Sequence, residues 1–438
     1  MAGPVMQALD RVRWPESSRL FAAAAVLVLV ALIDGYRIAR ALPQPQFGDE
    51  WRYLFYANNL AHGFYSPRER IFLWNGPGYP LFLLPFVKAS WIDGARYANA
   101  LLHGAAMAYA WLILRRLLPA LWAAGAVAVL ALYEPLNEHL PLLYTEVLTF
   151  FLVTAWIHHA LASPASRFHR AVAGGYLGFL CLTKVVVGAV LPVFLMGVGA
   201  VWLRRRSEVV RPYLTQAIVA LALCVPWLAY TYDLTGKAFY WSSAAANSFY
   251  WLTSPYPEEW GDWYHQGWVH ENPMLRAHHS KIVDETSGLA QNPNLSVSEQ
   301  VFNMCTPESS SIYLEAGLRN VREHPLKFAL NWSANLVRLF LDVPVSVRGT
   351  PLWNPYSVYN VPLLGWTAFV AVFAWRRRRR ATWLPPSRWW PIGALTLLIL
   401  AAYSLSSVVA RFLVPLVPIW WLGTVGWFRV AQRQGKSV

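Results

Sequence analysis

The sequence is poor in cysteine and in charge, and both shortages narrow the kind of protein that it encodes. Only three cysteines occur in 438 residues, and two of them, Cys181 and Cys224, fall inside apolar runs. Cys305 alone lies in a long polar segment, so no disulfide framework is available to hold that segment together. Charged residues make up 14% of the chain and hydrophobic residues 56%. This balance excludes an ordinary soluble domain, in which about 25% of residues are charged.

The apolar residues come in blocks of roughly 20, which is the length a helix needs to cross a hydrocarbon layer of about 30 Å. The sequence therefore predicts an all-α polytopic membrane protein with about ten transmembrane helices. A cleaved signal peptide is an alternative for the first block, but its apolar stretch is long for that purpose. The predicted spans lie near residues 20–42, 94–114, 117–136, 141–162, 170–183, 185–203, 212–232, 360–375, 388–408 and 411–430.

The net charge of +14 predicts an orientation in the membrane, because the cations gather in short groups at the ends of apolar blocks. These groups are Arg11, Arg13 and Arg19; Arg115 and Arg116; Arg167 and Arg170; Arg204 to Arg206; Arg376 to Arg380; and Arg433 and Lys436. With the N-terminus in the cytoplasm, every group lies on the cytoplasmic side, as the positive-inside rule requires. Both termini are then cytoplasmic. No nucleic-acid partner is expected, since the membrane accounts for the basic loops.

Three parts of the chain follow from this topology. Residues 1–232 form an N-terminal transmembrane module whose first outer loop is 43–93. Residues 233–358 form an outer-face segment rich in Trp and Tyr, with short helices and turns that are too few for an independent globular core. Within it, 323–343 is predicted to be an amphipathic helix at the outer surface, because a crossing there would place the arginine run outside. Residues 359–438 form the C-terminal transmembrane helices.

Two adjacent carboxylates, Asp49 and Glu50, follow the first span in "PQPQFGDEWRYLFYANNLAHGFYSP" (43–67). One interpretation makes Asp49 an ordinary N-cap of the short interfacial helix "DEWRYLFYANNLAHG". The other is catalytic: a partly desolvated carboxylate has a raised proton affinity and can take the proton of a hydroxyl nucleophile. The second carboxylate then orients the first or binds a cation.

The acidic pair is followed by further segments that together resemble one group of enzymes. An acidic pair in the first outer loop, before a short aromatic helix, is similar to the GT-C glycosyltransferases, which include the protein O-mannosyltransferases and the lipid A aminoarabinose transferase. Five later segments resemble that family in order and in sidedness. They are "WNGPGYPLFLLP" (74–85), "YTEVLTFFLVTAW" (144–156), "GFLCLTKVVVGAVLP" (178–192), "GLRNVREHPLKFALNW" (317–332) and "ARFLVPLVPIWWL" (410–422).

The resemblance implies a GT-C-like fold with juxtamembrane helices on the outer face. It also implies an integral-membrane glycosyltransferase that moves one sugar from a polyprenyl-phosphate donor to an acceptor. Lipid A or lipopolysaccharide, O-antigen, another lipid-linked glycan and a protein all remain open as the acceptor. Asp49 matches the proposed general base, with Glu50 as its neighbour, in a single inverting displacement. The implied location is a bacterial inner membrane with a periplasmic active site, and no organic cofactor is expected.

The sequence departs from this family pattern before the second span. The lipid A aminoarabinose transferase has a Glu-Lys there, for a metal and a phosphate, where this chain reads Asn75-Gly76-Pro77-Gly78. A divalent metal (Mg, Mn or Ca) is therefore in doubt, and the phosphate must find another cation. Lys184 and Arg411, at the outer ends of spans, are the candidates. A snorkelling side chain is the alternative for Lys184, and an ordinary residue at a span end for Arg411.

Other polar residues near the outer face could contact the acceptor, the sugar or a metal. These candidates are Glu146, Glu138, His139, Asn75 and Tyr79. His139 could equally be an ordinary loop histidine. The later histidines His265, His270, His278 and His279 lack the spacing of a zinc site. We interpret them as surface residues, since adjacent rings point to different faces of a regular element.

Three other functions fit parts of the sequence. A lipid-linked glycan transporter or flippase would show paired halves and interrupted helices, and neither is evident here. A binding or scaffolding membrane protein would leave the acidic pair and Lys184 without a role. A GT-C-like glycan polymerase or ligase is closer, although the modest outer segment favours a single-sugar donor. The sequence gives no oligomeric state.

Overall fold

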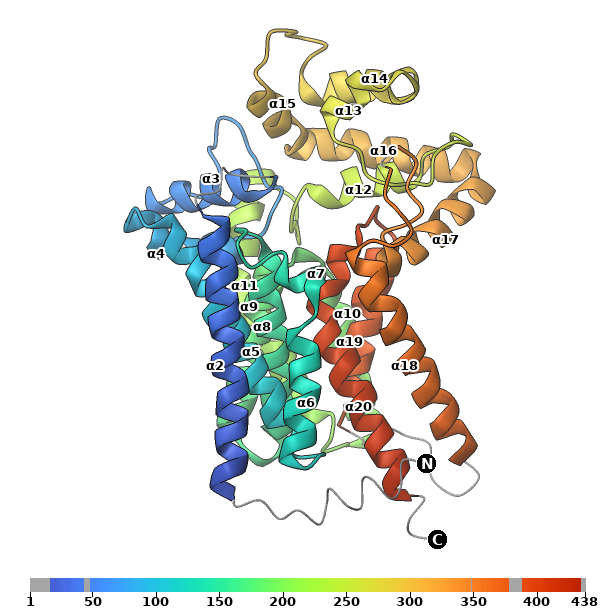
Figure 1. Ribbon diagram of the computed structural model, residues 1–438. Coiled ribbons are helices and arrows are strands. Elements are labelled where there is room, and N and C mark those ends of the chain that lie inside the picture. Colours follow the sequence, from blue (N-terminus) through green and yellow to red (C-terminus); the bar gives the residue numbers. More distant parts are fainter. Residues whose placement is uncertain (1–15, 43–47, 348, 378–387, 435–438) are drawn as a thin grey trace.

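The computed structural model describes residues 16–42, 48–347, 349–377 and 388–434, which are helical and contain no strand (Figure 1). The predicted all-α class is confirmed. Arg11, Arg13, Arg378 to Arg380 and Lys436 of the basic groups lie outside the described residues. The helices of the main bundle are α2 (Glu16–Ala41), α5 (Ile92–Leu114), α6 (Ala120–Ala131), α8 (Thr145–Ala162), α9 (Arg167–Thr183), α10 (Val185–Arg205), α11 (Arg211–Thr235), α18 (Pro355–Arg377), α19 (Trp390–Ser404) and α20 (Val417–Gln434).

The remaining helices are shorter and lie mostly at one end of this bundle, where they form a cap (Figure 1). They are α3 (Glu50–Ala61), α4 (Gly78–Lys88), α7 (Glu134–Asn137), α12 (Ala244–Leu252), α13 (Gln266–Glu271), α14 (Pro273–Ser287), α15 (Val297–Met304), α16 (Pro307–Glu323) and α17 (Pro325–Leu341), with the 3-10 turns η1 (Ser163–Ala165) and η3 (Ala410–Leu416).

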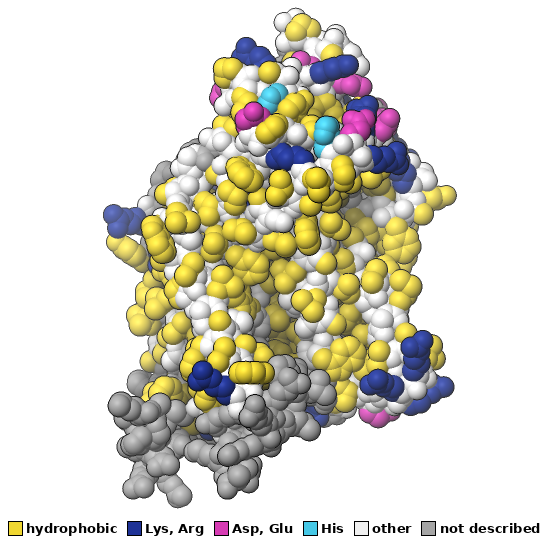
Figure 2. Space-filling view, turned by 90° about the vertical axis from the view of Figure 1, so that its right-hand side faces the viewer, with side chains coloured by type: hydrophobic (Ala, Val, Ile, Leu, Met, Phe, Trp, Pro, Cys, Tyr) yellow, Lys and Arg dark blue, Asp and Glu magenta, His cyan; other side chains and the backbone are white. Residues whose placement is uncertain are grey.

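Six of the described helices are long and apolar enough to cross a membrane, so the chain is a multi-pass membrane protein. They are α5, α8, α10, α11, α18 and the continuous unit Ala410–Gln432. Two shorter apolar helices, α6 and α19, run beside them, and the predicted count of ten spans is not confirmed. Figure 2 shows an apolar band between two ends that carry the charged side chains.

Helix α2 begins, and α20 ends, at the end of the bundle opposite the cap (Figure 1). The described chain therefore begins and ends on the same side of the bundle. That this side is cytoplasmic stays a prediction.

The outer segment contains more buried apolar surface than the sequence indicated. Helices α12 to α16 surround a cluster of their own, in which Trp251, Tyr264 and Tyr313 are almost fully buried. The Trp and Tyr residues of this segment therefore fill, in part, a second core. The sequence hides this core because its members are spread over some 70 residues without one period.

Helix α17 is amphipathic, as predicted for 323–343, and its polar stripe is the buried one. Asn331, Asn335 and Arg338 are 0% exposed, whereas Leu326 is 83% exposed. Asn331 donates hydrogen bonds to the carbonyls of 252 and 254, and Arg338 to those of 260, 261 and 344. Asn335 donates to the carbonyls of 404 and 406, so the polar stripe joins the outer segment to the bundle, and the apolar face is left outward.

Candidate functional site

The acidic pair lies in the turn that leads into α3. Gly48 has a φ of 55°, and a Cβ there would lie 2.2 Å from the Tyr144 hydroxyl, so this turn requires glycine. Asp49 is the N-cap residue of α3, but its carboxylate makes no capping hydrogen bond. Its backbone N–H instead donates to the Tyr144 hydroxyl at 3.4 Å. Asp49 therefore occupies the N-cap position of α3, as the first interpretation expected, but its side chain does not make the capping hydrogen bond.

The Asp49 carboxylate lies between two guanidinium groups. Arg52, one turn along α3, forms an ion pair with it, and Arg411 of η3 donates to its second oxygen at 2.6 Å. Burial alone would raise the pKa of Asp49, but attraction to Arg52, Arg411 and Lys184 lowers that pKa far below its usual range. The raised proton affinity expected for Asp49 is therefore wrong, because the two arginines outweigh the effect of burial.

Glu50 points away from this pair into the protein interior. Its side chain is fully buried, accepts the Leu143 backbone N–H at 2.7 Å and pairs with Arg96 at 3.2 Å. Arg96 also binds Asp93 and the Pro141 carbonyl. Glu50 thus fixes the loop before α8 onto α3 and α5. In this structure the two neighbouring carboxylates have separate surroundings.

A second ion pair lies beside the first. Lys184, at the junction of α9 and α10, contacts Glu146 in the first turn of α8 at 3.1 Å. The Lys184 side chain is 13% exposed, so it does not extend into water as a snorkelling lysine would. Its ammonium lies 5.5 Å from the centre of the Phe412 ring, next in sequence to Arg411.

The outer end of the bundle therefore gathers charges from four separate parts of the chain. We call Asp49, Arg52, Glu146, Lys184 and Arg411 the charge cluster. Three cations and two carboxylates leave it with a net charge of +1. Such a surplus of partly buried positive charge suits an anionic ligand.

The Asn-Gly-Pro-Gly stretch has a packing role that explains the absence of larger side chains there. A Cβ on Gly76 would lie 2.2 Å from the Leu182 carbonyl oxygen, and one on Gly78 would lie 2.4 Å from the Thr183 hydroxyl. The start of α4 therefore packs directly on the segment that ends at Lys184. Glycine is needed here for close approach of two backbones.

Several buried polar atoms near the charge cluster have no hydrogen-bond partner among the described residues. They are Asn75 Oδ1, Tyr79 Oη, Arg52 Nε and Arg411 Nε. The Asn75 amide is within 3.5 Å of the Tyr53 hydroxyl, and the Tyr53 and Tyr79 rings are 4.9 Å apart. Native interiors pair almost all such groups. Unpaired donors and acceptors beside a charge cluster are what a ligand site requires.

His139 and Glu138 lie at the margin of the cluster. His139 is buried, its Nδ1 lies 2.8 Å from the Pro135 carbonyl, and burial lowers its pKa, so it is neutral at pH 7. Burial raises the pKa of Glu138, whose side chain is 36% exposed. In the described ranges, the expected candidates Glu138, His139 and Glu146 do not form a three-ligand metal group.

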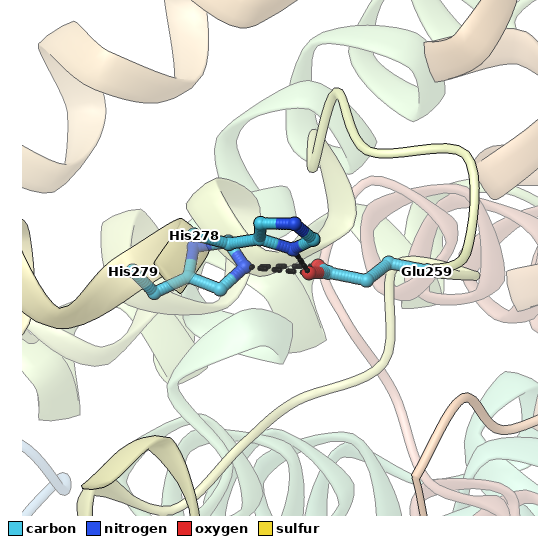
Figure 3. A group of neighbouring side chains, drawn as sticks. All are labelled: Glu259, His278 and His279. Carbon is cyan, nitrogen blue, oxygen red and sulfur yellow. Dashed lines mark hydrogen bonds and ion pairs between the residues drawn. The ribbon is translucent and has the colours of Figure 1, made fainter. Parts of the chain in front are cut away.

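The expectation that His278 and His279 are surface residues is wrong for His279, whereas the His278 side chain is 20% exposed. His279 is 1% exposed, and both imidazoles contact the Glu259 carboxylate (Figure 3). The loop that carries Glu259 folds across α14 and reaches both rings, which local spacing does not reveal. Sequence reasoning also missed Arg52, although an arginine three residues after an acidic helix start is a recognisable ion-pair spacing.

Comparisons with known proteins gave matches to solved structures. No family model and no curated protein matches the chain. One solved structure is the archaeal oligosaccharyltransferase AglB from Archaeoglobus fulgidus with an inhibitory peptide and a dolichol-phosphate, at 12% identity and a TM-score of 0.48. It is matched over 92% of this chain, which spans only 50% of AglB.

ArnT from Cupriavidus metallidurans is also similar, in two structures. In the apo state it is 15% identical with a TM-score of 0.39, over 94% of this chain and 78% of ArnT. Bound to undecaprenyl phosphate it is 13% identical with a TM-score of 0.38, over 95% of this chain and 79% of ArnT. The function is argued below from the residues of this chain.

Proposed function

We propose that the chain is a GT-C superfamily glycosyltransferase that moves one sugar from a polyprenyl-phosphate donor to an acceptor at the outer face of the membrane. The observation that carries the proposal is the charge cluster: a carboxylate and a surplus of cations, at the level where apolar helices meet a polar cap. One substrate of such a site is expected to be a lipid with an anionic headgroup.

The donor phosphate would bind Lys184 and Arg411, which lie at the cap end of the bundle. A planar guanidinium can bind two phosphate oxygens, while the ammonium acts as a point charge. Arg52 adds positive charge on the α3 side. With the phosphate bound, these groups offset the charge that develops on the leaving polyprenyl phosphate.

Asp49 would act as the general base. In the ligand-free arrangement its low pKa keeps it ionised, which leaves it able to accept a proton but with little driving force. When Arg411 turns to the phosphate, Asp49 loses one cationic partner and its pKa rises. The donor then activates the base, so proton transfer is favoured once both substrates are present.

The proposed reaction is a single displacement. The acceptor oxygen or nitrogen forms a bond to the anomeric carbon while the bond from that carbon to the phosphate oxygen breaks. The bonding electrons leave with the polyprenyl phosphate, and the acceptor proton goes to Asp49. Attack opposite the leaving group inverts the anomeric configuration. Asn75, Tyr79 and Tyr53 would contact the sugar or the acceptor, and no step requires a metal.

The proposed setting is a bacterial inner membrane, with the cap in the periplasm and both termini in the cytoplasm. The acceptor would be lipid A or lipopolysaccharide, O-antigen, another lipid-linked glycan or a protein. In this scheme Glu50 positions α3 and does not touch substrate.

The test is mass spectrometry of envelope glycolipids and glycoproteins from cells with the gene intact, deleted or carrying Asp49→Asn. We expect one sugar mass to be lost from one acceptor class, equally in the deletion and the variant. Accumulation of the complete lipid-linked glycan on the cytoplasmic face would instead indicate a flippase. Loss of a whole preassembled glycan would indicate a polymerase or ligase. If the sugar is lost in the deletion but not in the Asp49→Asn variant, the chain is still a transferase, but Asp49 is not its general base.

A further inference from the structure

Three side chains in the cap, away from the charge cluster in sequence, converge on one point. Glu259 lies in the loop after α12, and His278 and His279 lie in α14 (Figure 3). Glu259 Oε1 lies 2.8 Å from His278 Nδ1, and Glu259 Oε2 lies 2.9 Å from His279 Nε2. The three ligand atoms all lie within 4.8 Å of one another.

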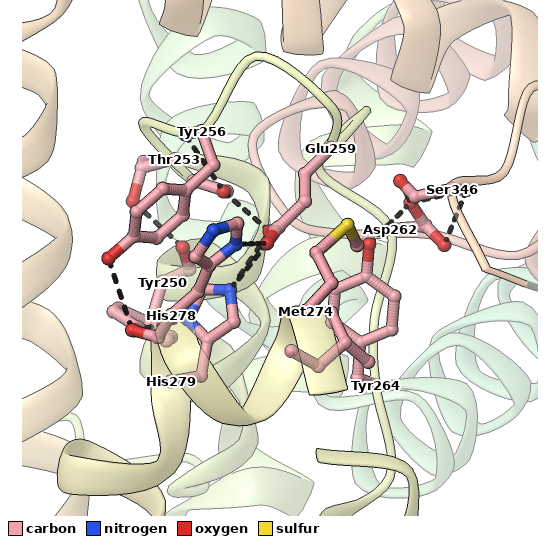
Figure 4. Close-up of polar contacts among 12 residues, drawn as sticks. Tyr250, Thr253, Tyr256, Glu259, Asp262, Tyr264, Met274, His278, His279 and Ser346 are labelled. Carbon is pink, nitrogen blue, oxygen red and sulfur yellow. Dashed lines mark hydrogen bonds and ion pairs between the residues drawn. The ribbon is translucent and has the colours of Figure 1, made fainter. Parts of the chain in front are cut away.

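The two adjacent histidines reach the same carboxylate through different ring nitrogens. Their rings are nearly perpendicular, at 84°, with centres 6.0 Å apart. The Tyr256 ring stacks on His278 at 3.6 Å and 5° and fixes its orientation (Figure 4). One helix can therefore present two nitrogens to a single point although the residues are neighbours in sequence.

The surroundings hold each ligand in the orientation that metal binding needs. The Tyr250 hydroxyl lies 2.8 Å from His279 Nδ1, which leaves His279 Nε2 for the Glu259 side (Figure 4). Ser254 donates to Glu259 Oε2 at 2.6 Å, and Lys327 of α17 contacts the Glu259 carbonyl. Metal-binding histidines nearly always have such a partner on the second nitrogen, and ligating carboxylates are likewise hydrogen-bonded.

We propose that Glu259, His278 and His279 bind one Zn²⁺ ion. Two imidazoles and one carboxylate form a common three-residue zinc set, in which the fourth position is left to water. The imidazoles make Mg²⁺ and Ca²⁺ poor alternatives, because those ions prefer oxygen ligands. Bound zinc would join the loop after α12 to α14 and, through Lys327, to α17. It would therefore stabilise the cap, whether or not the proposed transfer reaction is correct.

The first test uses the wild-type full chain in detergent, purified through a tag without histidine and stripped with a chelator. Titration with Co²⁺, as a spectroscopic substitute for Zn²⁺, should give the visible absorption of a four- or five-coordinate nitrogen and oxygen site. When Zn²⁺ is added back to the stripped chain and the excess is removed by desalting, zinc analysis should give about one ion per chain. A wild-type chain that neither retains zinc nor gives the cobalt spectrum overturns the proposal, and the contacts are then hydrogen bonds alone.

Variants then locate the ion. His279→Asn and Glu259→Gln should each lower zinc affinity by at least about tenfold, and zinc should raise the Tm of the wild type more than that of either variant. His62→Asn is the matched control, because that imidazole is exposed and bonds only the Asn58 carbonyl among the described contacts. Equal zinc binding by His279→Asn and the control would place the ion elsewhere and overturn the assignment.

If the variants fail to fold, the cobalt titration of the wild type still decides. Asp49→Asn should bind zinc normally, which separates this site from the proposed transfer reaction.

Discussion

The neighbouring carboxylates Asp49 and Glu50 have different partners in the structure. Asp49 pairs with two arginines at the edge of the cap, and Glu50 is enclosed by Arg96 and a backbone N–H. The sequence alone could mark both as an acidic pair near the membrane. It could not separate them, because the separation depends on Arg96 and Arg411, which lie 46 and 362 residues away from their partners.

The first prediction separates the two carboxylates by substitution. Asp49→Asn should abolish sugar transfer while lowering the free energy of unfolding only modestly, by about 1 kcal/mol, because its ion pairs are partly exposed to solvent. Glu50→Gln should instead lower the free energy of unfolding by about 1–3 kcal/mol, because it removes the buried charge paired with Arg96, which keeps only the half-exposed Asp93 as an anionic partner. Thermal unfolding in detergent and a transfer assay check both. A stable but inactive Glu50→Gln chain would mean that Glu50 takes part in the chemistry.

The second prediction concerns pH. Because the pKa of Asp49 is lowered, the carboxylate stays ionised from neutral to mildly acidic pH. Its ion pairs stabilise the fold above the pKa of the unfolded chain, about 3.9, and that stabilisation is lost only as pH falls through the lower folded value. Arg52→Gln removes an attracting charge, so the pKa of Asp49 should rise and the acid limb of the rate profile should move to higher pH.

The matched control for this pH experiment is Arg52→Lys, which keeps the positive charge. Its acid limb should remain near that of the wild type. Identical profiles for Arg52→Gln and Arg52→Lys would show that Asp49 does not set the acid limb.

At the scale of elements, hydropathy predicted where helices cross and amphipathicity predicted α17. It did not predict which face of α17 is buried. The polar stripe faces inward because carbonyls of the outer segment and of the loop before η3 require donors. A helix at an interface can be stabilised by its polar face against protein and its apolar face against lipid, so burial cannot be inferred from polarity alone.

The third prediction tests the link from α17 to the charge cluster. The Asn335 amide binds the carbonyls of 404 and 406 and the N–H of 408, in the loop that leads to Arg411. Asn335→Leu should cost about 1–3 kcal/mol for each backbone group left unpaired and should weaken donor binding through Arg411. Ser333→Ala, on the exposed side of the same helix, should change neither. Unaltered donor affinity in a folded Asn335→Leu chain would contradict the link.

The fourth prediction tests the close packing before α4. Gly78→Ala would bring a methyl group to 2.4 Å from the Thr183 hydroxyl, so α4 must shift away from the α9–α10 junction. We expect a loss of about 1–3 kcal/mol in stability together with reduced turnover, because Lys184 moves. Gly125→Ala in α6 is the control, since nothing lies within 4 Å of its added Cβ. Thermal unfolding of the two variants provides the comparison, and equal stability would argue against a packing role.

At the scale of the whole molecule, the sequence predicted a helical membrane protein with an outer site made of Asp49, Lys184 and Arg411. Lys184 and Arg411 were singled out because an ionisable residue at the end of an apolar block is costly without a partner, whereas Asp49 was singled out by the family resemblance. Their role as a site stays a prediction. Arg52 was missed although its spacing of three residues from Asp49 is a local signal. The Glu259 group could not be predicted, because it depends on how a cap loop folds over α14, and no short-range pattern encodes that.

The whole arrangement joins an apolar bundle, a helical cap and a positive cluster between them. The cluster is the feature on which the proposed chemistry depends. If no lipid phosphate binds to the charge cluster, the proposed donor and the proposed activation of Asp49 are both wrong.

The most direct test is therefore binding of undecaprenyl phosphate and undecaprenol to the purified full chain, measured by native mass spectrometry or by displacement of a fluorescent lipid. We predict that the phosphate form binds and the alcohol does not, and that Lys184→Met and Arg411→Gln each weaken binding by about tenfold or more, as expected for a charge-assisted hydrogen bond. Equal binding of the two lipids, or unchanged affinity in both variants, would contradict the account.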